Sequence, residues 1–333
     1  MSRAAILSFS ARGADTAARV AAALAEDYAV ETHAPRGNLK ELTASLFPRV
    51  EALVFVGACG IAVRAIAPHL VSKTVDPAVL VIDEKGQFVI SLLSGHIGGA
   101  NDLARRVAQA LGATPVITTA TDVNRRFSAD AWAARQGLAI DSMDAAKRFS
   151  AEILKRDLPL FSDFPVEGKL PSGIVMGEGG DCGLAVSCRD VHPFDATLLL
   201  IPRLLHVGVG CKRGTAAESI DAAVRAALEG AGLRLEAMKR VASIDVKKDE
   251  EGLRAWADGK GLPLTFFSAD ALNAVPGEFT ASAFVLKTVG VDNVCERAAM
   301  ASAGEGARLI LKKTSLNGVT VAAALEKWSV CFE

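Results

Sequence analysis

Residues 57–122 read GACGIAVRAIAPHLVSKTVDPAVLVIDEKGQFVISLLSGHIGGANDLARRVAQALGATPVITTATD, and this stretch decides the fold. Within it, short apolar runs typical of strands alternate with alanine-rich stretches whose apolar residues recur at helical spacing. Residues 78–93 contain two apolar runs around the turn sequence EKGQ, which predicts a hairpin. In the segment NDLARRVAQALG, Leu103, Val107, Ala110 and Leu111 share one helical face. Such alternation predicts βα units around a mainly parallel sheet.

The same alternation continues on both sides of this stretch. A strand followed by a helix is expected from residue 4 onward, and a second βα series begins with LLHVGVG at residues 204–210. Prolines punctuate the chain between the two series, where several short apolar runs occur. We therefore predict an α/β fold of two three-layer α/β/α units, with mainly parallel sheets, joined by a smaller central module. The predicted domains are an N-terminal α/β domain over 1–126, a central linker module over 127–203 and a C-terminal α/β domain over 204–333.

Composition excludes several classes of protein. Lysine plus arginine number 37 and aspartate plus glutamate 38, so the net charge is −1 and no overall field attracts nucleic acid or a membrane surface. The six cysteines show neither zinc-site nor disulfide-framework spacing, so no metal site is expected. The chain starts with no recognisable secretion signal, which favours a cytoplasmic protein. Any anionic ligand must then be bound by a local cluster of donors.

Glycine and polar residues cluster just after predicted strands, at residues 57–64, 94–102, 118–122 and 208–215. The carboxyl ends of parallel strands share one edge of a sheet, so these four loops are expected to line one edge, or two edges that face each other. Glycine corners that lead into helices favour anion binding. Neither the dinucleotide-binding nor the Walker glycine pattern occurs in these loops. Thr215 and Glu218 fit a capping box, with Lys212 and Arg213 just before the helix.

His96 is the strongest candidate for proton transfer, because it lies in the glycine-rich corner SGHIGGAND. We expect it to act as a general base, with Asp122 or Asp76 orienting it or relaying a proton. Other interpretations stay open: His96 could bond only to backbone carbonyls, and Asp122 could be a helix cap. Cys59 and Cys211 also occupy corners, but isolated cysteines of this kind are usually inert packing residues. A serine hydrolase is disfavoured, since the nucleophile-elbow pattern is missing.

These loops carry a family resemblance. Residues 57–122, with the strings SGHIGGAN and TTATD, closely resemble the N-terminal region of the CbiG family, the cobalt-precorrin-5A hydrolases of anaerobic cobalamin biosynthesis. The later strings GVGCKRGT, ASIDVKKDEEGL, VCERAAMASAG and GVTVAAAL resemble the family's C-terminal domain, which also occurs as a separate small protein in the aerobic pathway. The middle of the chain matches the family's variable region by position only.

The resemblance implies a reaction on a cobalt-bound tetrapyrrole that carries a δ-lactone: water opens the lactone, acetaldehyde leaves and cobalt-precorrin-5B forms. It implies no cofactor beyond the cobalt carried by the substrate, and as partners this substrate and neighbouring pathway enzymes, with no nucleic acid or membrane. Arg64 and Lys73 either snorkel or, with the glycine corners, hold the substrate's carboxylates. The substrate-binding candidates are Gly57, Gly60, Arg64, Lys73, Ser94, Gly95, Gly98, Gly99, Asn101, Thr118, Thr119, Gly210, Lys212, Arg213 and Thr215.

Two alternatives to hydrolysis remain at this point. A protein that binds corrinoid intermediates and hands them on would retain the ligand without releasing acetaldehyde. An unrelated α/β enzyme would use the glycine corners as cradles for a phosphorylated metabolite. The order of the motif-bearing loops argues against the second alternative.

Overall fold

The computed structural model describes residues 1–72 and 75–332, so the predicted binding residue Lys73 lies outside the described residues. Two compact units make up the chain. The first comprises Met1–Arg135 with Ile153–Arg156, and the second comprises Gln136–Glu152 with Asp157–Glu333. The central segment thus shares a unit with the C-terminal domain, and the domain boundaries predicted at 126/127 and 203/204 stay a prediction. No helix in the described ranges is long and apolar enough to cross a membrane.

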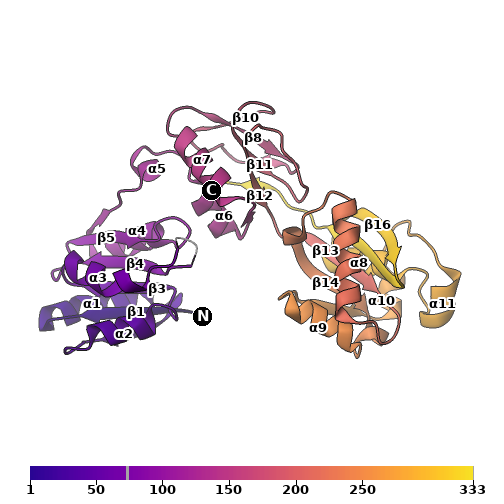
Figure 1. The fold of residues 1–333 in the computed structure, drawn as a ribbon, viewed down its shortest axis with the longest axis horizontal. Coiled ribbons are helices and arrows are strands. Elements are labelled where there is room, and N and C mark those ends of the chain that lie inside the picture. Colours follow the sequence, from indigo (N-terminus) through magenta and orange to yellow (C-terminus); the bar gives the residue numbers. More distant parts are fainter. Residues whose placement is uncertain (73–74, 333) are drawn as a thin grey trace. The chain divides into compact units, whose positions relative to one another are not determined.

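The first unit is built on a six-stranded sheet with the order β2-β1-β3-β4-β5-β6 (Figure 1). In β1, Ala4 and Ile6 face one apolar cluster while Ala5 and Leu7 face another, so both sides of the sheet are buried. Helices therefore cover both faces, as the sequence predicts. Its elements are β1 (Ser2–Ser8), α1 (Ala11–Leu24), β2 (Tyr28–His33), α2 (Leu39–Leu46), β3 (Ala52–Val56), α3 (Cys59–Ile66), η1 (Ala67–His69), β4 (Ala78–Ile82), β5 (Phe88–Leu93), α4 (Ala100–Leu111), β6 (Thr114–Val116), α5 (Ala120–Val123) and α6 (Ala129–Gln136).

The predicted hairpin is confirmed, and it reverses the direction of the sheet. Strands β1 to β4 are parallel, β5 pairs with β4 antiparallel, and β6 is parallel to β5. The loops at 94–102 and 118–122 consequently leave one end of the strands, whereas the corner at 57–64 follows β3 at the opposite end. Of the two arrangements expected, the one in which Gly57, Gly60 and Arg64 share an edge with His96 is therefore wrong, because a hairpin stands between the two βα units.

The second unit contains a smaller five-stranded sheet with the order β10-β8-β11-β12-β7, in which only β7 is antiparallel to its neighbour. Near the end of the chain, β18 (Val330–Cys331) pairs with β9 of this segment. The elements of the central segment are β7 (Ala139–Ile140), α7 (Met143–Glu152), β8 (Leu158–Ser162), β9 (Val166–Glu167), β10 (Ile174–Met176), β11 (Gly183–Val186) and β12 (Thr197–Ile201).

The other sheet of this unit has the order β15-β14-β13-β17-β16, with β13, β14 and β15 parallel and a C-terminal antiparallel hairpin. A Cβ at Gly208 would lie 1.8 Å from the carbonyl oxygen of Cys295, so only glycine lets α12 pack directly on β13. The remaining elements are β13 (Leu205–Gly210), α8 (Ala217–Gly230), η2 (Leu235–Ala237), β14 (Met238–Ile244), η3 (Asp245–Lys247), α9 (Glu251–Gly259), β15 (Leu264–Phe267), α10 (Ala269–Asn273), α11 (Ala283–Val289), α12 (Val294–Ala303), β16 (Arg308–Leu316) and β17 (Val319–Leu325).

The observed architecture confirms an α/β class with mainly parallel sheets. Two local expectations differ from it. The loop expected over 118–122 contains the short helix α5, with Thr119 as its N-cap, after β6 stops at Val116. Helix α8 has Ala216 as its N-cap, while the Thr215 hydroxyl donates to the carbonyl of Lys212 at 2.8 Å. The predicted capping box is therefore wrong, because the helix starts one residue too late for Thr215 to cap it.

Candidate functional site

A tight turn after β5 brings His96 to the end of the sheet. Ser94 adopts a left-handed backbone with φ 56°, and a Cβ at Gly98 would lie 2.4 Å from the Ser94 Cβ. Glycine at 98 is therefore required by the close return of the chain rather than by a ligand. Gly99, with φ 78°, then caps the start of α4. The turn leaves the imidazole partly exposed between two neighbouring helices.

The imidazole of His96 lies between two carboxylates. Its Nε2 is 3.0 Å from Asp122 Oδ2, and its Nδ1 is 3.2 Å from Asp130 Oδ1. Nε2 is also 3.2 Å from the hydroxyl of Thr121. Hydrogen bonding to Asp130, helped by the negative charges of both aspartates, raises the pKa of His96 although burial acts to lower it. The protonated ring, which donates from both nitrogens, is the form that this geometry stabilises.

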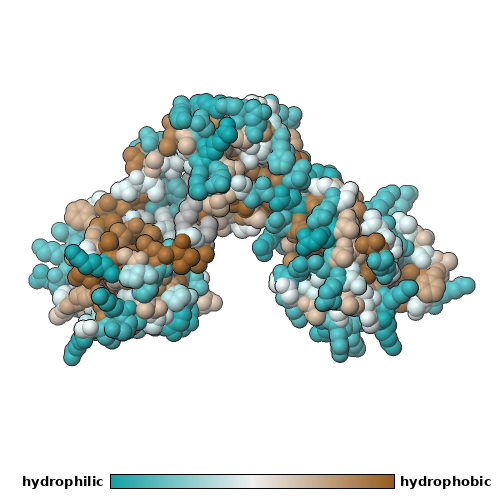
Figure 2. All heavy atoms as spheres, viewed as in Figure 1, coloured by the Kyte–Doolittle hydropathy of each residue, from teal (hydrophilic) through white to brown (hydrophobic). Residues whose placement is uncertain are grey.

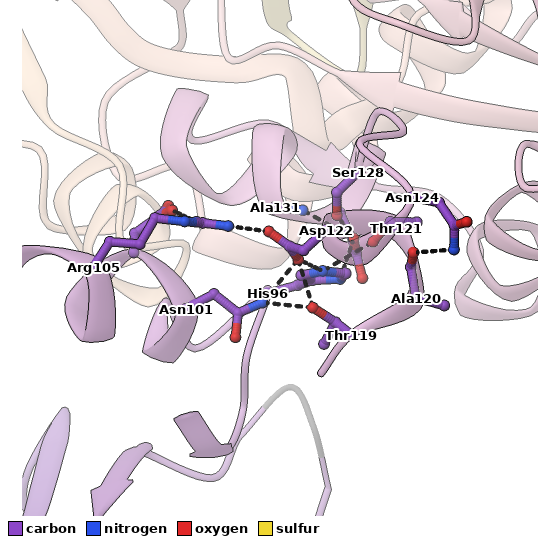
Figure 3. A network of polar contacts seen from close by, with 12 residues as sticks. His96, Asn101, Arg105, Thr119, Ala120, Thr121, Asp122, Asn124, Ser128 and Ala131 are labelled. Carbon is purple, nitrogen blue, oxygen red and sulfur yellow. Dashed lines mark hydrogen bonds and ion pairs between the residues drawn. The ribbon is translucent and has the colours of Figure 1, made fainter. Parts of the chain in front are cut away.

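Asp122 is saturated with donors, as Figure 3 shows. Its Oδ2 accepts from Thr119 Oγ1 at 2.5 Å, from Asn101 Nδ2 at 3.0 Å and from His96, while Arg105 pairs with Oδ1. Burial acts to raise the pKa of Asp122, but the hydrogen bonds from Thr119, His96 and Arg105 outweigh it and lower the pKa. Asp122 is therefore a stable anion that holds His96 in place, and a poor proton acceptor itself.

Asp130 fixes the other side of the ring. It lies in the first turn of α6, and its side chain is 8% exposed. Its Oδ1 accepts from Ser128 Oγ at 2.7 Å and from the Ala131 amide at 3.0 Å. The sequence reading missed this residue. Its only local signal is an acidic side chain at the start of a helix, which usually does no more than favour the helix dipole.

The backbone amides of the loop that carries His96 offer fewer donors to an oxyanion than the glycines of this loop suggest. The N–H groups of Gly99, Ala100 and Asn101 donate to carbonyls of His96, Ser94 and Gly95 within the same turn. The amides of Ile97 and Gly98 have no acceptor in the described part of the chain, so these two remain available to a ligand. Asn101 Oδ1 is also buried without a donor among the described residues.

Asp76 has a structural role in this region. Its carboxylate accepts from the Val71 amide at 3.0 Å, and its carbonyl accepts from Ser94 Oγ at 2.9 Å. Asp76 thus anchors the start of the turn that carries His96, and no contact between the two side chains occurs among the described residues. Of the predicted catalytic residues, the structure brings His96 and Asp122 together, whereas Asp76 is connected to the His96 turn only through Ser94.

The other predicted binding residues divide between different places. Thr118 directly precedes Thr119, beside Asp122. Arg64 is exposed on α3, where its guanidinium donates to the carbonyl of Gly60 at 3.2 Å. Gly210, Lys212, Arg213 and Thr215 belong to the second unit, at the loop between β13 and α8. Burial raises the pKa of the neighbouring Cys211 thiol, which disfavours a thiolate nucleophile there.

Comparisons with known proteins agree with the order of the motifs. The family model for cobalamin synthesis G N-terminal matches residues 41–122, which include His96 and Asp122, and the model for cobalamin synthesis G C-terminus matches residues 205–324. The chain is 35% identical to the cobalt-precorrin-5A hydrolase of Priestia megaterium, over 87% of this chain and 82% of that protein. It is 36% identical to the cobalt-precorrin-5A hydrolase of Salmonella typhimurium, over 79% of each chain.

A third relative matches a shorter part of the chain. Protein CobE of Sinorhizobium sp is 34% identical over 36% of this chain and 79% of its own length. The two family models and the long, colinear matches to curated relatives together show that the chain belongs to the cobalamin synthesis G (CbiG) family.

Proposed function

We propose that this protein is a cobalt-precorrin-5A hydrolase, which opens the δ-lactone of the substrate and releases acetaldehyde to give cobalt-precorrin-5B. The observation that carries the proposal is the His96 cluster at a sheet end, of which His96 and Asp122 lie within the segment matched by the N-terminal family model. The cluster provides in one place a fixed imidazole, two carboxylates and the amides of Ile97 and Gly98, which have no acceptor among the described residues. These are the groups that lactone opening requires.

The proposed reaction has two steps. Water adds to the acyl carbon and the acyl C–O bond breaks, which frees a carboxylic acid and a hydroxyl. The hydroxyl then loses its proton, its oxygen becomes the carbonyl of acetaldehyde, and the C–C bond to the ring breaks. The electron pair passes into the conjugated macrocycle, which takes up a proton. The cobalt is part of the substrate, so no cofactor of the protein is needed.

His96 is the residue that we propose for the proton transfers. The two carboxylates favour its charged form, so we propose that it enters the cycle as an acid and becomes a base only after it has given up a proton. Asp130 still accepts from Nδ1 in the neutral ring, so the orientation is kept while Nε2 takes a proton back. The amides of Ile97 and Gly98 are the proposed donors to the oxyanion formed during lactone opening.

Apolar surface lies near this site and suits a large ring. Leu70, Val71 and Val75 are 48%, 75% and 70% exposed, in the segment that Asp76 ties to the His96 turn. Figure 2 shows apolar surface on the N-terminal unit. An exposed patch of this kind marks a binding surface more often than a free one.

The test is anaerobic incubation of the full-length protein with cobalt-precorrin-5A, following acetaldehyde release and the mass of the macrocycle. We expect acetaldehyde to be released. The mass of the product macrocycle should equal that of the substrate plus one water minus one acetaldehyde. Retention of the ligand with acetaldehyde at the background rate would indicate a carrier of corrinoid intermediates instead. No binding and no turnover would reject both functions.

A further inference from the structure

The C-terminal domain contains a cavity that the proposed chemistry does not use. Its volume is about 830 Å³, within the range of roughly 300–1,000 Å³ common for small-molecule sites. Gly210 and Ile244, the last residues of the parallel strands β13 and β14, lie in its wall. Ligands of open α/β sheets bind at this end of the strands.

The wall of the cavity combines apolar and cationic side chains. Phe284, Val285 and Val289 of α11 contribute apolar surface, together with Ile244 and Val294. Four basic residues also line it: Lys212, Arg213, Lys247 and Lys313. Lys247 pairs with Glu250 at 2.9 Å, and Arg213 is close enough to help lower the pKa of Glu250, whereas Lys212 and Lys313 form no ion pair in the described ranges. The cavity is therefore suited to a ligand with a broad apolar body and several negative charges.

The cavity wall is held by a buried carboxylate. Glu296 is fully buried and accepts from the Thr280 amide at 2.7 Å, the Asn293 side chain at 2.8 Å and the Lys313 amide at 2.6 Å. These contacts join the start of α12, the segment before α11 and strand β16. The residues that line the cavity are thus preorganised, which lowers the entropy cost of binding.

Phe284 is 78% exposed although it lines the cavity, and Val246 on another element of the wall is 56% exposed. Large apolar side chains in this position lose exposed area only when something fills the cavity. In Figure 2, apolar colour also appears on the part of the domain that carries α11.

We infer that this cavity binds the macrocycle of a tetrapyrrole carrying several carboxylates, the ring lying against α11 and the carboxylates on Lys212, Arg213 and Lys313. The inference rests on the proposed function for the identity of the ring. It adds Lys313 and the apolar residues of α11 to the predicted binding residues Lys212 and Arg213. Charge-assisted contacts to carboxylates give the site its preference for an acid over an ester.

The test measures binding to the full-length protein by calorimetry, with cobyrinic acid as a stable corrin probe and its methyl ester as the uncharged version. We expect the ester to bind at least tenfold more weakly than the acid. Lys313→Ala should weaken binding of the acid about tenfold, as expected for loss of one charged hydrogen bond, and Lys212→Ala with Arg213→Ala should weaken it further.

Matched controls are available on the same elements. Lys312→Ala removes a cation from the same strand at a position outside the cavity, and Leu286→Ser changes an exposed leucine of α11 that does not line it. Neither should alter binding, whereas Phe284→Ser should weaken binding of both acid and ester. Equal affinities for the Lys313→Ala and Lys312→Ala variants, or no binding of cobyrinic acid to the parent, would overturn the inference.

The outcomes separate this inference from the proposed function. If the cavity variants bind the probe and release acetaldehyde from cobalt-precorrin-5A like the parent, the proposed hydrolase function stands and the proposed binding role of the cavity is rejected. If the probe binds tightly and this binding depends on the cavity residues, but no acetaldehyde is released, the binding role of the cavity stands and the hydrolase function is rejected.

Discussion

His96 in the first unit and His206 in the C-terminal domain each have a carboxylate within about 3 Å, yet their pKa values shift in opposite directions. Nε2 of His206 is 2.9 Å from Glu326 Oε2, and its Nδ1 is 2.7 Å from the hydroxyl of Ser302. Burial lowers the pKa of His206, and the pull of Glu326 in the other direction does not compensate. For His96, two aspartates outweigh burial and raise it.

The difference lies in the charges around each ring. Glu326 also pairs with Lys239, so its negative charge is shared with a cation. His96 faces two carboxylates, Asp122 and Asp130, whereas Glu326 beside His206 is accompanied by the cations Lys239 and Arg240, which lower the pKa of His206 further. A histidine bonded to a carboxylate is thus not by itself a proton-transfer site. The net charge of the surroundings decides whether the pKa of the ring is raised or lowered.

The largest expected effect tests whether the two histidines differ in function. His96→Gln removes the proposed proton carrier and should reduce turnover of cobalt-precorrin-5A by about 10²–10⁴-fold, the usual range for loss of general acid–base catalysis. His206→Gln should leave turnover within a few-fold of the parent. Acetaldehyde release at saturating substrate measures both.

Binding of cobyrinic acid serves as the control, because His96→Gln should leave it unchanged if the variant is folded. Comparable turnover in the two glutamine variants would remove His96 from the proton-transfer role and abolish the distinction between the two sites.

A smaller effect is expected when one carboxylate is neutralised. Asp130→Asn removes the strongest cause of the raised pKa of His96, so this pKa should fall, and turnover should drop about tenfold as the ring loses its orientation. Asp102→Asn is the matched control, since Asp102 pairs with Arg105 at 2.7 Å and with Arg135 at 3.1 Å but does not contact the imidazole.

Proton NMR titration of the His96 ring measures the shift directly. An unchanged pKa in Asp130→Asn would mean that burial and Asp122 set the protonation of His96, and Asp130 would then be only a helix-start residue.

The sequence predicts much of the fold, because periodicity is local. The runs at 78–93 contain the hairpin. On α4, Leu103, Val107 and Leu111 are buried as predicted, whereas Ala110 is exposed because it lies at the margin of that face. What the hairpin does to the direction of the later strands follows only when strand pairing is known. The sequence therefore predicts the corner at 57–64 beside the loops at 94–102 and 118–122, from which the antiparallel pair β4–β5 separates it.

The candidate site is predictable only in part for the same reason. His96 and Asp122 stand in unusual strings after strands, but Asp130 reaches the imidazole through tertiary packing of α6 against the loop. Thr215 fits a capping box by spacing, yet the helix begins after Ala216. Lys313 joins Lys212 at the cavity because β17 pairs with both β13 and β16. Sequence spacing cannot show contacts of this kind.

The smallest effect sharpens the comparison through stability. His96 has a raised pKa in the fold, so its stabilising contribution is complete below about pH 6.5 and is lost as the pH rises through the raised value. His206 has a lowered pKa, so its contribution is complete above about pH 6.5 and is lost as the pH falls through the lowered value. Each unit of difference between folded and unfolded pKa corresponds to about 1.4 kcal/mol.

Urea unfolding across pH can separate the two contributions, because the regions have their own buried tryptophans, Trp132 in the first unit and Trp256 in the second. In variants that keep only one of these two tryptophans, replacing His96 by glutamine should reduce the loss of stability at high pH that Trp132 reports. Replacing His206 should flatten the loss at low pH seen by Trp256. Slopes of the same sign for both histidines would show that the carboxylates around His96 do not hold it charged, and the acid role proposed for it would fail with them.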